Sequence, residues 1–190
     1  MTCVVGMCEK GSVWIGSDSC GSNGFNYTIR KDKKVFRRDN MIFGFTSSFR
    51  MGQLIQTSLV IPEHRESVDD FTYLTTLFID SVMSCFRDKS FLRVKDNEAG
   101  GGTFLVGYRG NIYEVEADFQ VGQPVEQYAA CGCGLYFALG AMHALQKHKL
   151  APKEKITRAL AAAAGFAEAV RPPWNFVSLA GDKRNTGKPL

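Results

Sequence analysis

Three residues near the start of the chain have the types and spacing of a nucleophile and its activating groups. Thr2 follows Met1, Asp18 lies sixteen positions further on, and Lys34 follows after another sixteen. A threonine hydroxyl is a weak nucleophile and needs a base close to it. Removal of Met1 would free the α-amino group of Thr2, and a pKa near ~8 leaves part of such an amine neutral at physiological pH. The amine can then accept the hydroxyl proton, directly or through one water.

Lys34 and Asp18 have complementary tasks beside such an amine. A lysine ammonium close by disfavours protonation of the amine and stabilises a developing alkoxide, and a carboxylate next to the lysine keeps it charged and oriented. Taken singly, Thr2 is an ordinary strand residue, Asp18 an ordinary turn residue and Lys34 an ordinary solvated strand end. Only their joint spacing favours a catalytic set.

The elements that must position these residues are short strands and amphipathic helices. Apolar or alternating runs separated by turn residues predict the strands, and apolar residues at helical spacing predict the helices. The predicted strands are 2–7, 12–19, 34–37, 41–45, 103–108, 111–115, 128–131 and 174–179, and the predicted helices are 49–59, 71–86, 135–148 and 153–168. The stretches 21–26 and 96–102 are expected to be loops. Helices segregated from antiparallel strands indicate an α+β layered fold.

Several segments resemble known catalytic segments. They are Thr2-Cys3-Val4-Val5, Ile15-Gly16-Ser17-Asp18-Ser19 and Lys33-Lys34-Val35, followed by Gly44-Phe45-Thr46-Ser47-Ser48 and Tyr128-Ala129-Ala130-Cys131-Gly132-Cys133-Gly134. Together they are similar to the proteasome β-subunits and the bacterial protease HslV, which are N-terminal-nucleophile (Ntn) hydrolases. The resemblance covers nearly the whole chain, up to about Leu179, and extends to a bacterial proteasome homologue.

The resemblance implies a four-layer α-β-β-α sandwich of two antiparallel sheets, formed by one domain over residues 1–180 with a polar tail at 181–190. It also implies an N-terminal threonine peptidase that hydrolyses peptide bonds inside a homo-oligomeric double ring with six or seven subunits per ring. The substrate would be a peptide or an unfolded polypeptide, and an ATPase unfoldase or cap stays undetermined. Two alternatives are open: a catalytically silent assembly protein, and a non-peptidase Ntn amide hydrolase.

Ser47, Ser19 and Cys133 are the supporting residues that the resemblance implies. Backbone N–H groups near Ser47 are expected to stabilise the oxyanion, although Ser47-Ser48 replaces the usual Gly-Gly pair. Cys133 stands where the family has a supporting serine, and a thiol is a weaker hydrogen-bond partner than a hydroxyl. Ser19 adjoins Asp18. For the later acidic residue of the family, the segment 161–169 offers only Glu168.

Composition and charge narrow the partners and the location. The formal net charge is +4 and is spread over separate short clusters, so no nucleic-acid partner is expected. The absence of a bilayer-length apolar run and of a signal peptide predicts a cytoplasmic protein whose six cysteines are reduced. The Cys131-Gly132-Cys133 segment lacks a second close Cys/His pair, so neither a metal nor a cofactor is expected. The apolar faces of the predicted helices 49–59 and 71–86 are expected to form ring contacts.

Overall fold

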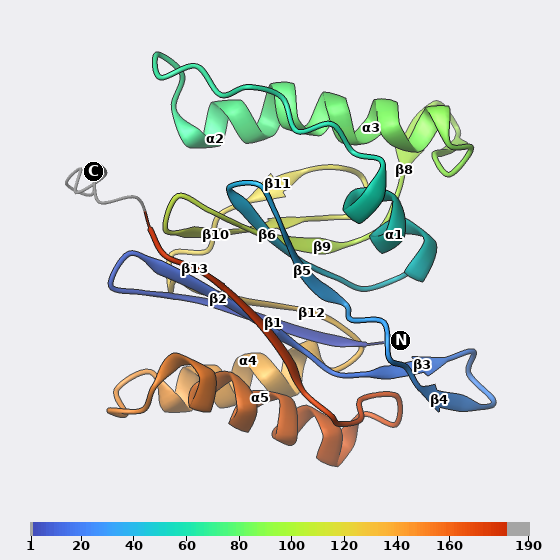
Figure 1. Cartoon of the computed structure of the whole chain (residues 1–190). Helices are drawn as coiled ribbons and strands as arrows, with labels where there is room; N and C mark the ends of the chain where they lie inside the picture. Colours follow the sequence, from blue (N-terminus) through green and yellow to red (C-terminus); the bar gives the residue numbers. More distant parts are fainter. Residues whose placement is uncertain (1, 182–190) are drawn as a thin grey trace.

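The computed structural model describes residues 2–181 and arranges them in four layers. Figure 1 shows α2 and α3 above, two stacked sheets in the middle, and α4 and α5 below. The inner faces of the two sheets pack on each other, and each outer face is covered by helices. The α-β-β-α sandwich of antiparallel sheets is therefore confirmed. Residues 182–190 of the expected tail lie outside the described residues, and the domain boundary near 180 stays a prediction.

The first sheet contains the N-terminal strand and has the order β12-β1-β2-β13, with antiparallel neighbours throughout. Its strands are β1 (Cys3–Glu9), β2 (Ser12–Ser17), β12 (Tyr128–Gly132) and β13 (Asn175–Leu179). Side chains alternate across a strand, so Val4 and Ile15 face the second sheet while Val5 and Met7 face the helices. The two hydrophobic faces of β1 explain why this strand lies in the interior of the sandwich.

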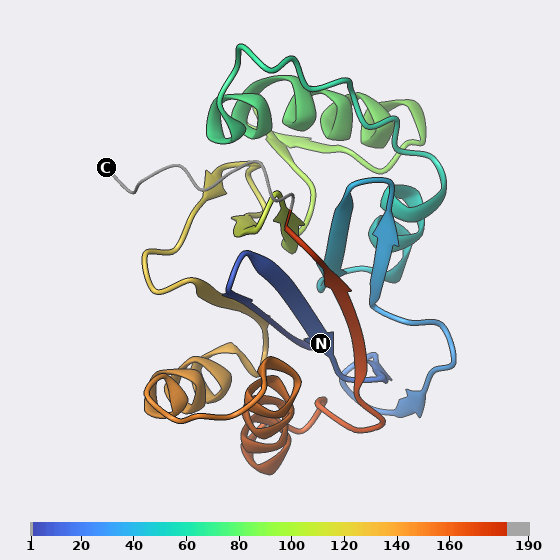
Figure 2. The same ribbon diagram turned by 60° about the vertical axis from the view of Figure 1, so that its left-hand side comes forward.

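The second sheet has the order β11-β10-β9-β6-β5 and is also antiparallel. Its strands are β5 (Val35–Arg38), β6 (Met41–Phe45), β9 (Phe104–Tyr108), β10 (Asn111–Val115) and β11 (Val121–Gly122). Val35, Ile42 and Leu105 pack against the inner face of the first sheet. Figure 2 shows β5 and β6 on the same side of the sandwich as β13, which matches the contacts between these strands.

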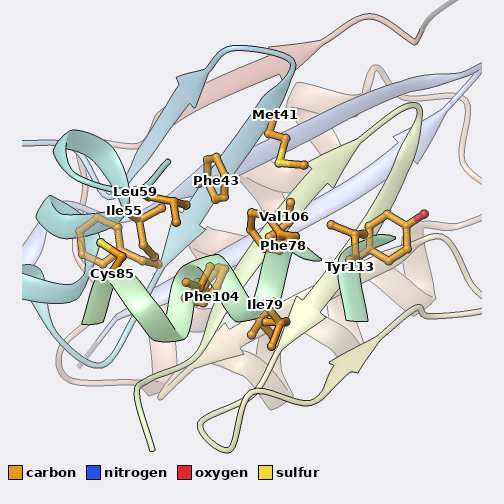
Figure 3. Packing of buried hydrophobic residues seen from close by; sticks show 14 of the residues in the cluster. Met41, Phe43, Ile55, Leu59, Phe78, Ile79, Cys85, Phe104, Val106 and Tyr113 are labelled. Carbon is orange, nitrogen blue, oxygen red and sulfur yellow. The ribbon is translucent and has the colours of Figure 1, made fainter. Parts of the chain in front are cut away.

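The helices cover the outer faces of both sheets. They are α1 (Phe49–Thr57), α2 (Asp70–Tyr73), the π-helical turn η1 (Leu74–Phe78), α3 (Ile79–Asp88), α4 (Leu135–Leu145) and α5 (Pro152–Phe166). Figure 3 shows the aromatic core between α3 and the second sheet, with Phe43, Phe78 and Phe104 among its members. No helix of the described part of the chain is both long enough and apolar enough to cross a membrane.

Three local features differ from the sequence-based expectations. The segment predicted as one helix over 71–86 contains the π-helical turn η1, which connects α2 to α3. The two expected loops contribute strands to small hairpins, β3 (Cys20–Ser22) with β4 (Tyr27–Ile29) and β7 (Arg93–Lys95) with β8 (Glu98–Gly100). The strands β4 and β7 are exposed along their whole length, and β3 and β8 are only three residues long, so no hydrophobic alternation marks these hairpins in the sequence.

The helix α1 does not offer the apolar surface that was expected for ring contacts. Met51, Leu54 and Ile55 are at most 1% exposed because they pack into the core under the second sheet. That expectation is wrong for the helix predicted at 49–59. On the longer helical segment, Phe71 is 44% and Leu77 45% exposed, so it does leave apolar side chains at the surface.

Candidate active site

A buried ion pair lies between the end of β2, an inner strand of the first sheet, and the start of β5, an edge strand of the second. Asp18 follows the last residue of β2 and Lys34 precedes the first residue of β5. The distance from Lys34 Nζ to Asp18 Oδ1 is 2.7 Å, and the side chains are 1% and 0% exposed. Burial lowers the pKa of Lys34, and the neighbouring Asp18 carboxylate opposes this shift. The Lys34 side chain is therefore held against one carboxylate, away from solvent.

The Asp18 carboxylate accepts hydrogen bonds from four donors. Besides Lys34, the backbone N–H groups of Cys3, Cys20 and Arg171 donate to it, with distances of 3.1, 2.8 and 3.4 Å. The backbone N–H of Asp18 in turn donates to the carbonyl oxygen of Cys3 at 3.2 Å. These bonds compensate for burial of the carboxylate and join three distant parts of the chain at one point.

Thr2 lies next to this ion pair, because Cys3 is the following residue and binds Asp18 through its backbone. Thr2 is 4% exposed, and its carbonyl oxygen accepts hydrogen bonds from Cys133 Sγ at 3.4 Å and from the Gly134 N–H at 3.5 Å. Gly132 pairs with Cys3 at the end of β12 and has a φ of +97°. A Cβ atom at Gly132 would lie 2.2 Å from the Thr2 carbonyl oxygen, so only glycine allows this approach.

The loop between β6 and α1 forms the opposite wall of the site. A cavity of about 60 Å³ is lined by Thr2, Ser22, Phe45, Thr46, Ser47, Ser48 and Phe49. Ser48 is the N-cap of α1, and its side chain accepts from the Met51 N–H at 3.4 Å. Ser47 has a φ of +66°, a left-handed conformation that is uncommon for residues with a side chain. The positive end of the α1 dipole therefore borders the cavity that contains Thr2.

The supporting residues occupy different places around this centre. The Ser19 hydroxyl binds the segment around the start of β13. It donates to the Pro173 carbonyl oxygen at 2.6 Å and accepts from Asn175 Nδ2 at 2.7 Å. It thus fixes the segment before β13. Cys133 is exposed and contacts Thr2 through the thiol described above. Glu168 is exposed on the segment that follows α5.

Cysteine side chains near Thr2 differ in their suitability as nucleophiles. Burial raises the pKa of Cys3 to about 12, and the nearby Asp18 carboxylate adds to this shift. A thiol with such a pKa stays protonated at neutral pH, so Cys3 is a packing residue. Among residues 2–181, no group of three or more His, Cys, Asp or Glu side chains is arranged to hold a metal ion.

Sequence reasoning missed the contributions of Arg171 and Asn175, and also an acidic cavity beside the site. This cavity of about 350 Å³ is lined in part by Ser47, Cys133, Glu114 and Glu116. Burial, with the neighbouring Glu116, raises the pKa of Glu114 to about 7. In the sequence, Glu114 is simply the polar member of an alternating strand, and no local signal indicates that it borders a cavity.

No family model and no curated protein matches the sequence. Among solved structures, BPH from Thiobacillus denitrificans superimposes with a TM-score of 0.78 at 18% identity, covering 96% of this chain and 100% of the other. HslV from Trypanosoma brucei gives a TM-score of 0.66 at 17% identity, covering 94% and 99%. Anbu, described as an ancestral β-subunit, from Yersinia bercovieri gives 0.66 at 12% identity, covering 94% and 82%.

The chain has the proteasome-like Ntn hydrolase fold. This finding confirms the resemblance inferred from the motifs at the level of fold. Sequence identities of 12–18% leave activity to be argued from the site itself. A second solved structure of the Thiobacillus protein, in complex with epoxomicin, has the same TM-score of 0.78.

Proposed function

We propose that this chain is a threonine-type endopeptidase in which Thr2, exposed by removal of Met1, is the nucleophile. The observation that carries the proposal is the buried pair of Asp18 and Lys34. The backbone N–H of Cys3, the residue after Thr2, donates a hydrogen bond to the Asp18 carboxylate of this pair. A buried ion pair contributes little net stability, because desolvation offsets the attraction of the charges. Beside a hydroxyl and an α-amine, the same pair supplies the charge that activation of the nucleophile requires.

The reaction begins with attack of Thr2 on the substrate carbonyl, which forms a tetrahedral adduct. The neutral α-amine takes the proton of Thr2 Oγ1 while this oxygen bonds to the substrate carbonyl carbon. The ammonium of Lys34 disfavours prior protonation of the amine and stabilises the developing negative charge on the hydroxyl oxygen. The substrate oxygen becomes the oxyanion, and backbone N–H groups near Ser47, with the N-terminal end of α1, stabilise it.

The remaining steps restore the chain. The scissile C–N bond breaks, the leaving amine takes the proton from the Thr2 α-amine, and the acyl group stays on Oγ1. A water then adds to the ester carbonyl and gives one proton to the α-amine. The C–O bond to Thr2 breaks, and that proton returns to Oγ1. One water is consumed for each peptide bond cleaved, and Lys34 and Asp18 end as they began.

The setting that we propose is a cytoplasmic homo-oligomeric double ring acting on peptides or unfolded polypeptides. Support comes from the proteasome-like fold and from apolar side chains exposed on α4 and at the end of α5. Tyr136 is 78% exposed and Phe166 77%, and the ring of Phe166 stacks on Phe137 at 5.2 Å. Exposed aromatic clusters of this kind commonly mark interfaces. Light scattering that gave a mass near the 21.0 kDa of one chain would remove the ring from the proposal.

The activity is tested on recombinant protein by intact mass, by labelling with an electrophile selective for N-terminal threonine, and by hydrolysis of peptides and small amides. We expect a mass lower by one methionine, a single label on Thr2, and hydrolysis of peptides. Thr2→Ala should lose label and activity but keep its assembly state. A processed chain without label would favour the silent assembly protein, and turnover of small amides alone would favour the amide hydrolase.

A further inference from the structure

Phe49, the first residue of α1, forms a wall between two cavities of very different size. The cavity that contains Thr2 has a volume of about 60 Å³. A second cavity of about 280 Å³ lies under the β3–β4 hairpin and is lined by Gly21, Ser22, Asn23, Asn26, Tyr27, Thr28, Arg30 and Phe49. Ser22 and Phe49 line both cavities, so these two residues form the partition between them.

The Phe49 ring is held in this position from two sides. The guanidinium carbon of Arg30 lies 3.9 Å from the ring centroid, which is a cation–π contact, and Phe45 packs edge-to-face at 5.7 Å. Arg30 is itself fixed by a bidentate pair with Asp32, with N–O distances of 2.8 and 2.7 Å. The stem of Arg30 occupies the space beside Gly21, where a Cβ would meet Arg30 Cδ at 2.6 Å. The partition is thus a braced element of the site.

The small cavity limits what can bind between Thr2 and the first turn of α1, and the acidic cavity of about 350 Å³ that Ser47 and Cys133 line is a separate space. A cavity of about 150 Å³ accommodates a benzene ring. The volume at Thr2 is about 60 Å³, so an aromatic or long side chain does not fit while Phe49 stays in place. Forcing a larger group into a packed site displaces its walls and weakens binding. A methyl or hydroxymethyl group has room, and Phe45 and Phe49 give it an apolar surface.

We propose that Phe49 is a specificity-determining residue that restricts the substrate residue on the acyl side of the scissile bond to small side chains such as those of glycine, alanine and serine. The inference rests on the proposed peptidase function and adds the substrate class to it. Truncation of Phe49 joins the cavity at Thr2 to the larger one beyond, so that a leucine or phenylalanine side chain can enter.

The test compares the full-length wild type with Phe49→Ala, using fluorogenic peptides that differ only in alanine, leucine or phenylalanine before the scissile bond. We expect wild type to show a kcat/KM for alanine at least about tenfold above that for phenylalanine, the scale of discrimination by pocket size. Phe49→Ala should reduce this ratio at least tenfold, and the ratio is the readout because Lys34 Nζ lies 5.7 Å from the Phe49 ring centroid and overall turnover can change with the ring. Phe49→Leu should lie between the two, and it remains informative where Phe49→Ala folds poorly.

Phe91→Ala is the matched control, because Phe91 is also partly buried in an edge-to-face pair, with Phe86 at 5.1 Å, and lines neither cavity. It should keep the selectivity of wild type. Equal cleavage after alanine and phenylalanine in wild type would overturn the inference, as would an unchanged ratio in the assembled, active Phe49 variants. Labelling of Thr2 by an electrophile without a side chain distinguishes failure of the peptidase proposal from failure of the Phe49 proposal. An unlabelled Thr2 together with no turnover of any peptide would remove both proposals. A labelled Thr2 with equal cleavage after alanine and phenylalanine would remove only the role of Phe49.

Discussion

Removing the charge of either partner of the buried ion pair should have unequal effects on stability. In Lys34→Met, the Asp18 carboxylate loses one of four donors and keeps the backbone N–H groups of Cys3, Cys20 and Arg171. In Asp18→Asn, Lys34 is 1% exposed and loses its carboxylate partner. The new side-chain NH₂ group also replaces an oxygen that accepted hydrogen bonds from backbone N–H groups, so donor faces donor. The second change removes more favourable interactions and creates a direct conflict between donors.

The magnitudes follow from these contacts. Leaving one member of a buried pair without its partner costs about 3–5 kcal/mol, which we expect for Asp18→Asn. The three retained backbone donors lower the expected cost for Lys34→Met to about 1–3 kcal/mol, the range for a lost hydrogen bond to a charged group. The difference between the variants should therefore be about 2 kcal/mol, a factor of roughly 30 in the folding equilibrium.

Urea denaturation at pH 7 and at one fixed protein concentration measures both variants, since assembly makes apparent stability depend on concentration. The double variant completes a cycle in which the two costs should be strongly non-additive, because the residues are in direct contact. A Lys34→Met variant that is less stable than Asp18→Asn would refute this account. So would two costs that simply add.

Three further outcomes are expected. Burial lowers the folded-state pKa of Lys34 below its ordinary 10.5, so the unfolded chain binds more protons than the folded chain just below pH 10.5. The unfolding free energy of wild type relative to Lys34→Met should therefore rise with pH up to about that point. A difference in unfolding free energy that does not change with pH would contradict this expectation. The pKa of Glu114 is raised from 4.5 to about 7, so the stability of wild type relative to Glu114→Gln should fall as pH rises from about 4.5 through 7. Thermal or urea unfolding measures this difference. Glu126→Gln, on the exposed segment before β12, is the control. Gly132→Ala should destabilise the chain by more than about 1–3 kcal/mol, because alanine is strained at a φ of +97° and its Cβ would collide with the Thr2 carbonyl; a change in melting temperature within error would contradict this reading.

The sequence predicted most of the elements because their signals are local. The apolar run of β1, the partly alternating pattern of β2, the turn between them, and the apolar spacing of α5 all lie within windows of a few residues. The hairpins β3–β4 and β7–β8 were missed because their strands have only three residues each and β4 and β7 are exposed throughout, so no apolar alternation marks them. The burial of Met51 and Leu54 was misjudged, because whether an apolar helix face meets its own core or a partner depends on packing that the helix sequence does not contain.

The candidate site also has a part that the sequence predicted and a part that it did not. The set of Thr2, Asp18 and Lys34 could be recognised because the spacing of the three residues along the chain matches that of the family which the sequence resembles. The roles of these residues stay predictions, although Asp18 and Lys34 do form a close pair. Contacts across more than 150 positions, such as Arg171 with Asp18 and Asn175 with Ser19, have no counterpart in local patterns. The partition made by Phe49 depends on Arg30 and Gly21, and only the folded chain brings them together.

The proposed reaction depends on the hydroxyl and the α-amine of Thr2. The most direct measurement is to treat the assembled protein with a peptide electrophile that bonds to both groups of an N-terminal threonine, and to locate the adduct by mass spectrometry of the digested chain. We expect one adduct per chain on the first peptide, at Thr2, with Met1 absent, and loss of the adduct in Thr2→Ala but not in Cys133→Ser. An adduct on Cys3 or Cys133, or a chain that retains Met1 while hydrolysing peptides, would contradict it.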